Sequence, residues 1–374
     1  MLLSDLQTPC LIADLRKLRA NATRMLDRVR EHGIGLRPHL KTTKSVDMAL
    51  LAHDGARGPI TVSTLKEAEY FAAHGFKDIT YAVAVTPNKL SRAADLLESG
   101  VDLKLLVSGL AAGQALVKFS APAPFPLMLE IDSGEHRTGF LPDDDALLQT
   151  AKLLAEWQGA RCVGLLTHGG HSYNGRSVGD FQRVAAEERA ALLKAQGRLS
   201  EIGLEQLVLS SGSTPTATFG TDFSGIDEVR PGVYLAGDLF QAQLGTVALD
   251  NIAVSVLASV IAHDPGRNKL MIDAGGLALS KDRSTAQAPV DQGYGLVVRD
   301  DGSPIPGDPV VAGVHQEHGE VTSTIPLPFD ALPVGSAVRV LPNHVCMTAA
   351  AYDRYFVVDG GEPIVAEWEK VAGW

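Results

Sequence analysis

Cysteines and long apolar runs are scarce in this chain. Its 374 residues contain only Cys10, Cys162 and Cys346, an odd number of cysteines scattered along the sequence. A disulfide framework is therefore not expected, and each thiol needs its own explanation. No segment approaches the roughly 20 uninterrupted apolar residues that a membrane span requires, so no association with a membrane is expected.

Positive charge is also scarce. The chain has 44 acidic and 33 basic side chains, a formal net charge of −11, and no run rich in lysine or arginine. Such a chain has no long-range attraction for nucleic acid or anionic lipid, so a small-molecule partner is expected instead. Residues 1–17 lack the basic start and sustained apolar region of an export signal, which predicts a cytoplasmic protein with reduced thiols.

A short apolar run, a small or polar tip and a longer helical pattern recur about eight times before residue 240. The apolar runs lie at 36–41, 60–63, 79–83, 103–107, 127–132, 162–168, 207–211 and 228–234. Stretches between them, such as 65–75 and 178–203, carry apolar residues at helical spacing. Alternating strands and helices form parallel βαβ units, and eight units predict an α/β fold with a closed (β/α)8 TIM-like barrel.

The pattern changes after residue 240. Short β-rich runs broken by glycine, proline and aspartate replace the long helices and predict a separate β domain. We expect a barrel over 14–240 and a β domain over 241–374 together with residues 1–13. The strand predicted around residues 8–13 could pair with that β domain.

The first apolar run ends at a lysine, Lys41, in the segment RPHLKTTKS. Catalytic groups in such a barrel lie at the carboxyl ends of the strands. A lysine that closes an apolar strand and points into the barrel mouth would lose solvation, which exposes its lone pair for Schiff-base chemistry. A solvated surface lysine is the alternative, and the position on the first strand favours the catalytic interpretation.

The ends of the seventh and eighth runs suit a phosphate group. Ser213 and Thr214, in SSGSTPT, would present hydroxyls and backbone N–H groups at the start of a short helix. Gly232, in RPGVYL, allows a close backbone approach near Tyr234. Phosphate sites in these barrels favour the loops after strands seven and eight, although ordinary turns are the alternative.

The fifth and sixth runs end in EIDSGEHRTG and THGGHSYN. Arg137 could place a permanent cation against a ring nitrogen or a carboxylate. His168 and Tyr173 could pack against a flat cofactor or hydrogen-bond to it. Alternatively, these polar groups could simply satisfy the backbone of their loops.

His344 and Cys346 stand two apart in VLPNHVCMT. On a strand this spacing puts both side chains on one face, where an imidazole and a thiolate could bind a metal such as Zn²⁺. A cysteine that is only a small buried hydrophobe is the alternative. Gln316 and His318, in HQEHG, form another polar cluster, for which solvated turn residues remain the alternative.

Segments in this order resemble the family that includes D-serine dehydratase, D-threo-3-hydroxyaspartate dehydratase and the low-specificity D-threonine aldolases, which are related in fold to alanine racemase. They span nearly the whole chain and include TPCLIADL, RPHLKTTKS, EIDSGEHRTG, SSGSTPT, EVRPGVY and PNHVC. The resemblance implies a fold-type III pyridoxal-phosphate enzyme with a C-terminal β domain, usually a homodimer. It implies that Lys41 binds the cofactor covalently, that Arg137 faces the pyridine nitrogen, and that SGST and PGVY lie near the phosphate.

Within this family, His-x-Cys is typical of dehydratases and His-x-Asp of aldolases. The sequence therefore favours a metal-assisted dehydratase that converts D-threo-3-hydroxyaspartate or D-serine into an α-keto acid and ammonia. A D-threonine-type aldolase, which would release glycine and an aldehyde, is one alternative, and a non-catalytic pyridoxal-phosphate carrier is another. A substrate carboxylate would need a cation, for which Arg283 is a candidate and a structural salt bridge the alternative. The GGH of THGGHSY departs from the family pattern and leaves the substrate contacts open.

Overall fold

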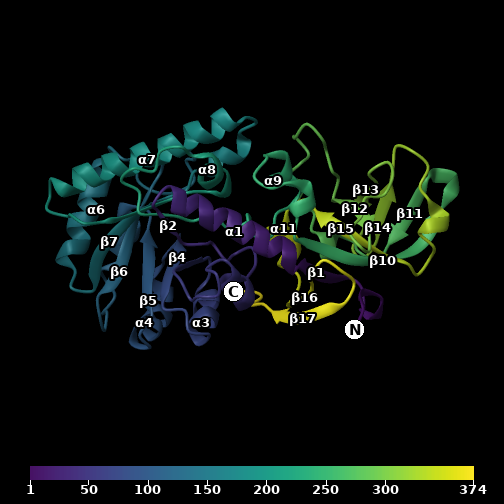
Figure 1. Ribbon diagram of the computed structural model, residues 1–374. Coiled ribbons are helices and arrows are strands. Elements are labelled where there is room, and N and C mark those ends of the chain that lie inside the picture. The colour runs from purple at the N-terminus through teal and green to yellow at the C-terminus, as the bar shows by residue number, and fades with distance from the viewer. The chain divides into compact units, whose positions relative to one another are not determined.

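The computed structural model describes residues 1–374, which divide into two compact units (Figure 1). The first unit contains residues 24–41 and 52–232 together with Trp374, and the second contains 1–23, 42–51 and 233–373. Helix α1 (Leu15–Glu31) contributes residues to both. The domain limits expected from the sequence, 14–240 and 241–374 with 1–13, stay a prediction.

The first unit is built on a parallel sheet in the order β2-β9-β8-β7-β6-β5-β4-β3. Its strands are β2 (Gly35–Leu36), β3 (Ile60–Val62), β4 (Asp78–Ala84), β5 (Asp102–Val107), β6 (Phe125–Ile131), β7 (Ala160–Thr167), β8 (Val208–Ser211) and β9 (Glu228–Val229). Beyond β2, the N–H of Leu40 donates to the carbonyl of Thr61 on β3 at 2.9 Å. The sheet therefore returns on itself, which confirms the predicted (β/α)8 barrel.

Helices follow the strands of this barrel, as the apolar periodicity predicts. They are α3 (Leu65–Ala73), α4 (Leu90–Glu98), α5 (Leu110–Leu116), α6 (Asp145–Glu156), α7 (Val178–Ser200) and α8 (Thr214–Phe219). Local chemistry sets where they begin: the Thr64 hydroxyl accepts from the N–H of Glu67 at 3.0 Å at the start of α3. Ser177 and Asp180 form a capping box at the start of α7.

The second unit is built on a mostly antiparallel sheet in the order β11-β14-β13-β12-β15-β10-β1-β16-β17. Its strands are β1 (Cys10–Asp14), β10 (Val254–Asp264), β11 (Lys269–Ile272), β12 (Gly295–Arg299), β13 (Val310–Val314), β14 (Gly319–Thr322), β15 (Ala337–Pro342), β16 (Arg354–Val358) and β17 (Ile364–Glu369). Strand β10 also pairs with β11, so part of the sheet closes into a ring. The pairing of β1 with β10 confirms the prediction for the N-terminal strand.

Short helices connect these strands, and none of the helices in the structure is long and apolar enough to cross a membrane. The short helices of the second unit are α2 (Val46–Leu51), α9 (Leu239–Gln243), α10 (Gly276–Leu279) and α11 (Val345–Ala349).

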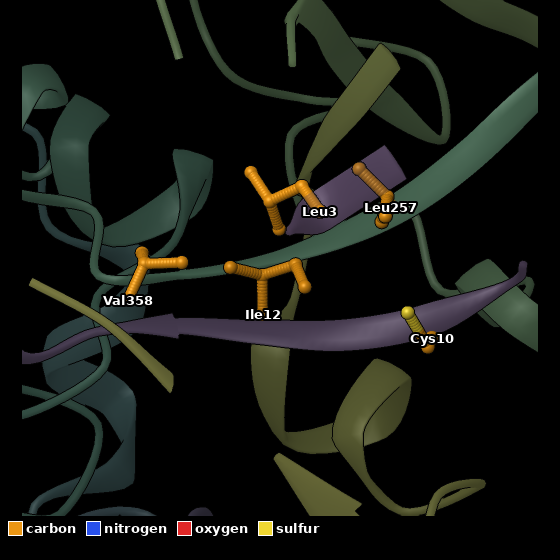
Figure 2. Close-up of a cluster of buried hydrophobic side chains, with 5 residues drawn as sticks. All are labelled: Leu3, Cys10, Ile12, Leu257 and Val358. Atoms are coloured by element: carbon orange, nitrogen blue, oxygen red, sulfur yellow. The ribbon is translucent and has the colours of Figure 1, made fainter. Parts of the chain in front are cut away.

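Alternate side chains of β1 form part of the core of the second unit. Figure 2 shows Cys10 and Ile12 of β1 with Leu257 of β10, Val358 of β16 and Leu3, all buried. Burial, followed by the charge of Asp273, raises the pKa of the Cys10 thiol to about 12. Cys10 is therefore a small hydrophobic residue, and its neutral thiol is a poor nucleophile.

Candidate functional site

A cavity of about 330 Å³ lies at the carboxyl ends of the barrel strands. Its polar and charged lining residues include His39, Lys41, Ser63, Glu130, Arg137, Thr138, His168 and Arg230. These residues lie at or just after the ends of several strands, where the catalytic groups of such barrels are found. Three residues proposed from the sequence, Lys41, Arg137 and His168, therefore share one space.

The side chain of Lys41 is exposed at this cavity. The predicted loss of solvation is therefore wrong for the protein alone. The physical reason is that Lys41 lies in the turn that follows the first strand, so the side chain lines the cavity without being enclosed by the barrel. Its amine stays accessible to a cofactor that enters the cavity.

Positive charge dominates the cavity. Arg230 is buried, and its guanidinium donates to the Ser210 hydroxyl at 2.7 Å and to the carbonyl of Thr167. Burial of the imidazole, followed by the charges of Lys41 and Arg137, lowers the pKa of His168 to about 3. Burial, followed by the charges of Lys41 and Arg230, holds the pKa of His39 well below its ordinary value. Both imidazoles are neutral at physiological pH, so the lysine and two arginines suit an anionic ligand.

Glu130 is the carboxylate in this lining. Burial raises its pKa, against the opposing effects of a hydrogen bond from Thr138 and the charge of Arg137. The Thr138 hydroxyl donates to one carboxyl oxygen at 3.0 Å, whereas the other oxygen is buried without a partner. Glu130 can therefore accept a hydrogen bond from a ligand or, once protonated, donate one.

Sequence reasoning missed five of the polar residues in this cavity: His39, Ser63, Glu130, Thr138 and Arg230. Arg230 directly precedes the Pro-Gly pair in the eighth apolar run, and Glu130 lies near the end of the fifth apolar run. Their position at strand ends was the available signal, but burial in a common space depends on the closed barrel.

The loop after β8 has the features expected of a phosphate site. Ser213 caps α8 and accepts from the N–H of Thr216 at 3.3 Å, and its hydroxyl lies 2.8 Å from that of Ser172. The hydroxyl of Thr214 is buried and has no hydrogen-bond partner. A buried polar group without a partner is costly, so this hydroxyl is available to a bound group.

A buried carboxyl holds this loop next to the loop after β7. The Oε1 atom of Glu188, on α7, accepts from the N–H of Gly169 at 2.6 Å and from that of Gly212 at 3.1 Å. Burial raises the pKa of Glu188, against the opposing effects of a hydrogen bond with Thr216 and of these two backbone hydrogen bonds. Glu188 thus fixes the backbone of the loops that carry His168 and Ser213.

The remaining cofactor candidates lie at three further positions. A Cβ atom at Gly232 would lie only 2.5 Å from the carbonyl oxygen of His39, so the close backbone approach is real. Tyr173 is half-buried, with its ring centroid 6.5 Å from that of His168. Tyr234, which belongs to the second unit, has a buried hydroxyl without a partner, and burial raises its pKa.

The assumption that His344 and Cys346 lie on a strand is wrong. Strand β15 ends at Pro342, His344 occupies the N-cap position of α11 without a capping hydrogen bond from its side chain, and Cys346 lies in the first turn of that helix. The two side chains still meet, because Cys346 is a hydrogen-bond partner of the imidazole. Thr42, which follows Lys41 in the sequence, places its hydroxyl 3.0 Å from the Cys346 sulfur.

The imidazole of His344 is held on its other side by a carboxylate. Its Nδ1 atom lies 2.6 Å from Oδ2 of Asp282. Burial alone would lower the pKa of His344, but the hydrogen bonds to Asp282 and Cys346 raise it to about 11. A metal that binds the ring would therefore have to displace a proton. The structure brings together no set of three or more His, Cys, Asp or Glu side chains able to hold a metal ion. The pair can supply two ligands, with Asp282 in the orienting position that commonly supports a metal-bound histidine.

Two buried polar residues fix the backbone around this pair. The Asn343 amide donates to the hydroxyl of Thr285 and to the carbonyl of Gly293, both at 2.7 Å. Asp238 accepts from the N–H of Gln241 at 2.8 Å and from that of Val345 at 3.0 Å, so one carboxylate caps both α9 and α11. The His344–Cys346 turn therefore rests on contacts that are distant in sequence.

The weaker substrate candidates have local partners or are exposed. Gln316 and His318 lie exposed in the turn between β13 and β14. Arg283 forms an ion pair with Asp291, and its guanidinium lies 5.5 Å from the centre of the Tyr294 ring. That is the structural salt bridge that the sequence left open as the alternative.

Comparison with known proteins covers the whole chain. Residues 13–239 match the alanine racemase N-terminal domain, and residues 253–358 match the putative serine dehydratase domain. The D-threo-3-hydroxyaspartate dehydratase of Delftia sp. (strain HT23) is 40% identical over 383 residues, with 100% of this chain and 99% of the relative covered. The D-serine dehydratase of Dictyostelium discoideum is 30% identical over 397 residues, with 100% and 98% covered.

A solved structure extends this similarity to three dimensions. It is a D-threo-3-hydroxyaspartate dehydratase with a cysteine replaced by alanine, in the metal-free form. Its TM-score is 0.94 at 39% identity, and 100% of each chain is covered. The chain therefore belongs to the family that contains D-threo-3-hydroxyaspartate dehydratase and D-serine dehydratase, built on an alanine racemase-like barrel and a serine dehydratase domain.

Proposed function

We propose that this protein is a pyridoxal-phosphate-dependent lyase that dehydrates D-3-hydroxy amino acids, with D-threo-3-hydroxyaspartate or D-serine as substrate. The products are an α-keto acid and ammonia. The observation that carries this proposal is the cavity at the strand ends, in which an accessible lysine shares one space with two arginines and two neutral histidines. Membership of the dehydratase family supports the same reaction.

The residues present fit pyridoxal phosphate. The accessible amine of Lys41 would attach it, and Arg137 would face its pyridine nitrogen. His168 and Tyr173 would lie beside the ring. The phosphate would be held at Ser213, Thr214, Gly232 and Tyr234, where two buried hydroxyls have no hydrogen-bond partner. The bound cofactor would serve as an electron sink that acidifies the substrate's α-proton.

Proton transfer falls to Lys41. Its amine, which is accessible at the cavity, would accept the α-proton of the substrate as a free base. The neutral imidazole of His168 adds no further charge to the cavity, so a substrate carboxylate would be attracted by the arginines.

Loss of the β-hydroxyl needs help, because hydroxide is a poor leaving group. We propose that His344 and Cys346 bind a divalent metal, with Zn²⁺ preferred because imidazole and thiolate are its usual ligands. Such a metal would supply Lewis acidity to the hydroxyl. The metal-free form of a related dehydratase with one cysteine replaced supports a metal held by cysteine.

We also propose that the enzyme is cytoplasmic and that it forms a homodimer. All three cysteines are free thiols, which supports a reducing compartment. The dimer rests on the resemblance, and sedimentation equilibrium of the purified protein measures it directly.

The test is to add D-threo-3-hydroxyaspartate and D-serine separately to the purified holoenzyme and to follow keto acid and ammonia, with and without EDTA. We expect release of both products that EDTA suppresses and Zn²⁺ restores. Cys346→Ala should lose the EDTA-sensitive activity. Cys162→Ala is the matched control, since burial raises the pKa of that thiol to about 11 and leaves it unreactive.

Two outcomes would contradict the proposal. Release of glycine and an aldehyde from D-threonine, without keto acid from the other substrates, would indicate an aldolase. Bound cofactor without turnover of any D-hydroxy amino acid would indicate a carrier.

A further inference from the structure

Arg339 is a buried cation between two apolar clusters of the second unit. It lies on β15 with only 7% of its surface exposed. In the sheet register it stands opposite Leu257 of β10 and Val298 of β12. Leu257 belongs to the cluster in Figure 2, and Val298 packs in a second cluster with Leu239, Ile252 and Leu296. Directly paired residues point to the same face, so the guanidinium projects between the two clusters.

This arrangement leaves the guanidinium poorly compensated. Its Nε atom is buried and has no hydrogen-bond partner. Burial lowers the pKa of Arg339, and the charges of Asp14, Asp300 and Asp301 oppose that effect through space. A buried charge is costly unless a charged or hydrogen-bonding partner satisfies it. A bound ligand with a hydrogen-bond acceptor could therefore satisfy the Nε atom of Arg339, for which the chain supplies no acceptor.

Arg339 lines a cavity of about 180 Å³. At about 30 Å³ for each water, that volume holds roughly six waters, or a molecule with about that many non-hydrogen atoms. Lys17, on α1, lines the same cavity, and its amine lies 3.4 Å from the carbonyl oxygen of Ile252. Two cationic side chains thus face one small space. It shares no lining residue with the cavity at the barrel strand ends.

The charges around the cavity favour a monoanion. Asp14 is buried there, and one of its oxygens accepts from the backbone N–H of Lys17 at 3.2 Å. Asp250 and Asp308 also line the cavity but are exposed. Water screens the exposed carboxylates, Asp300 and Asp301 included, so Asp14 is the buried negative charge that faces the two cations. One further negative charge inside the cavity would balance them. The exposed carboxylates would repel a more highly charged ligand.

The rest of the wall is apolar, with Leu296, Val298 and Leu341 among its residues. A ligand that fits this space has two parts. One is a negatively charged end that accepts hydrogen bonds from the guanidinium group, and the other is a short apolar chain. We propose that the cavity is a binding site for a small aliphatic carboxylate, which is held by Arg339 and Lys17. A carboxylate can accept two parallel hydrogen bonds from a guanidinium group, so the contact with Arg339 is expected to be stronger than the contact with Lys17.

The experiment uses sodium propionate as the probe, because it has a carboxylate and a short apolar tail but no group that reacts with Lys41. Propionate is titrated into the holoenzyme by isothermal calorimetry at constant ionic strength, and the melting temperature is followed in parallel. We expect a saturable site that depends on Arg339, separate from binding of a carboxylate by Arg137 and Arg230 in the strand-end cavity. We also expect a melting temperature that rises with propionate, because a ligand that binds the folded state stabilises it.

Arg339→Met should weaken propionate binding at least tenfold, and Lys17→Met should weaken it less. Arg299→Met is the matched control, since Arg299 lies on β12, pairs with Val338, and does not line the cavity. Its affinity for propionate should equal that of the wild type. Arg339→Lys gives a second test should the methionine variant fail to fold. Lysine keeps the positive charge but lacks the paired N–H donors of the guanidinium group, so the affinity for propionate should still fall.

Three results would overturn the proposal. They are the absence of saturable propionate binding, unchanged affinity in both Arg339 variants, and equal losses in Arg299→Met and Arg339→Met. Inorganic phosphate forms the comparison arm, and tighter binding of phosphate than of propionate would overturn the choice of a carboxylate.

Discussion

The Nδ1 atom of His344 lies 2.6 Å from Oδ2 of Asp282, although the two residues are 62 positions apart in the sequence. This contact sets the orientation of the ring and leaves Nε2 as the nitrogen that can bind a metal. Asp282 therefore acts through His344, as a positioning residue for the proposed metal pair.

We expect Asp282→Asn to weaken metal binding by about 10- to 100-fold, the usual effect of losing such a partner. The measurement is competition for Zn²⁺ between the apoprotein and a chromophoric chelator, which needs no turnover. Asp301→Asn, at an exposed position, serves as the control. Equal Zn²⁺ affinity in Asp282→Asn and wild type would show that the contact does not orient a ligand.

Asp238 should contribute more to stability than an ordinary helix cap, because its two oxygens cap α9 and α11. Loss of one cap costs about 1 kcal/mol, within a range of roughly 0.5–2. We expect Asp238→Ala to lower the free energy of unfolding by about twice as much as Asp144→Ala, which removes the single cap of α6. Urea unfolding of both variants checks the ratio, and equal losses would contradict the double role.

Glu188 should be replaceable by glutamine but not by alanine. The amide oxygen of glutamine can still accept from Gly169 and Gly212, whereas alanine leaves two buried N–H groups unsatisfied, at about 1–3 kcal/mol each. We expect Glu188→Ala to lose about 2–6 kcal/mol in urea unfolding and Glu188→Gln to stay close to the wild type.

Glu188 also predicts a pH dependence of the free energy of unfolding. Because the pKa of Glu188 in the folded protein lies above its ordinary value of 4.5, the folded state binds more protons than the unfolded state in that interval, and stability falls as pH rises through it. The unfolding free energy of the wild type, relative to Glu188→Gln, should therefore decline as pH increases from about 4.5. A difference that stays constant with pH would rule this out.

Gly232→Ala should destabilise the barrel just beyond β9, which ends at Val229. The new Cβ would lie 2.5 Å from the backbone oxygen of His39, and relieving that overlap costs about 1–3 kcal/mol. Gly197→Ala is the matched control, since it lies within α7 with nothing within 4 Å of the new atom. We expect it to stabilise the protein by about 0.5–1 kcal/mol. Thermal unfolding followed by circular dichroism separates the two, and equal melting temperatures would contradict the prediction.

The barrel could be predicted from the sequence because its information is local. Apolar runs and helical stretches alternate with periods that favour parallel βαβ units. Six of the eight strands were predicted to within two residues of their observed limits, whereas β2 and β9 end five residues earlier than predicted. The same order placed Lys41 at the carboxyl end of the first strand. The spacing of His344 and Cys346 indicated a candidate metal site, and the resemblance of the motifs indicated the family.

Tertiary structure decided what depends on distant contacts. Lys41 was expected to lose solvation at the barrel mouth and is exposed, because it lies in the turn after the strand. His344 and Cys346 were expected on a strand and lie at a helix start, because Asp238, more than 100 residues upstream, caps that helix. Burial of Arg230 and Arg339 also has no local signal. A residue's period in the sequence determines which face of an element it takes, but only packing between elements determines what that face meets.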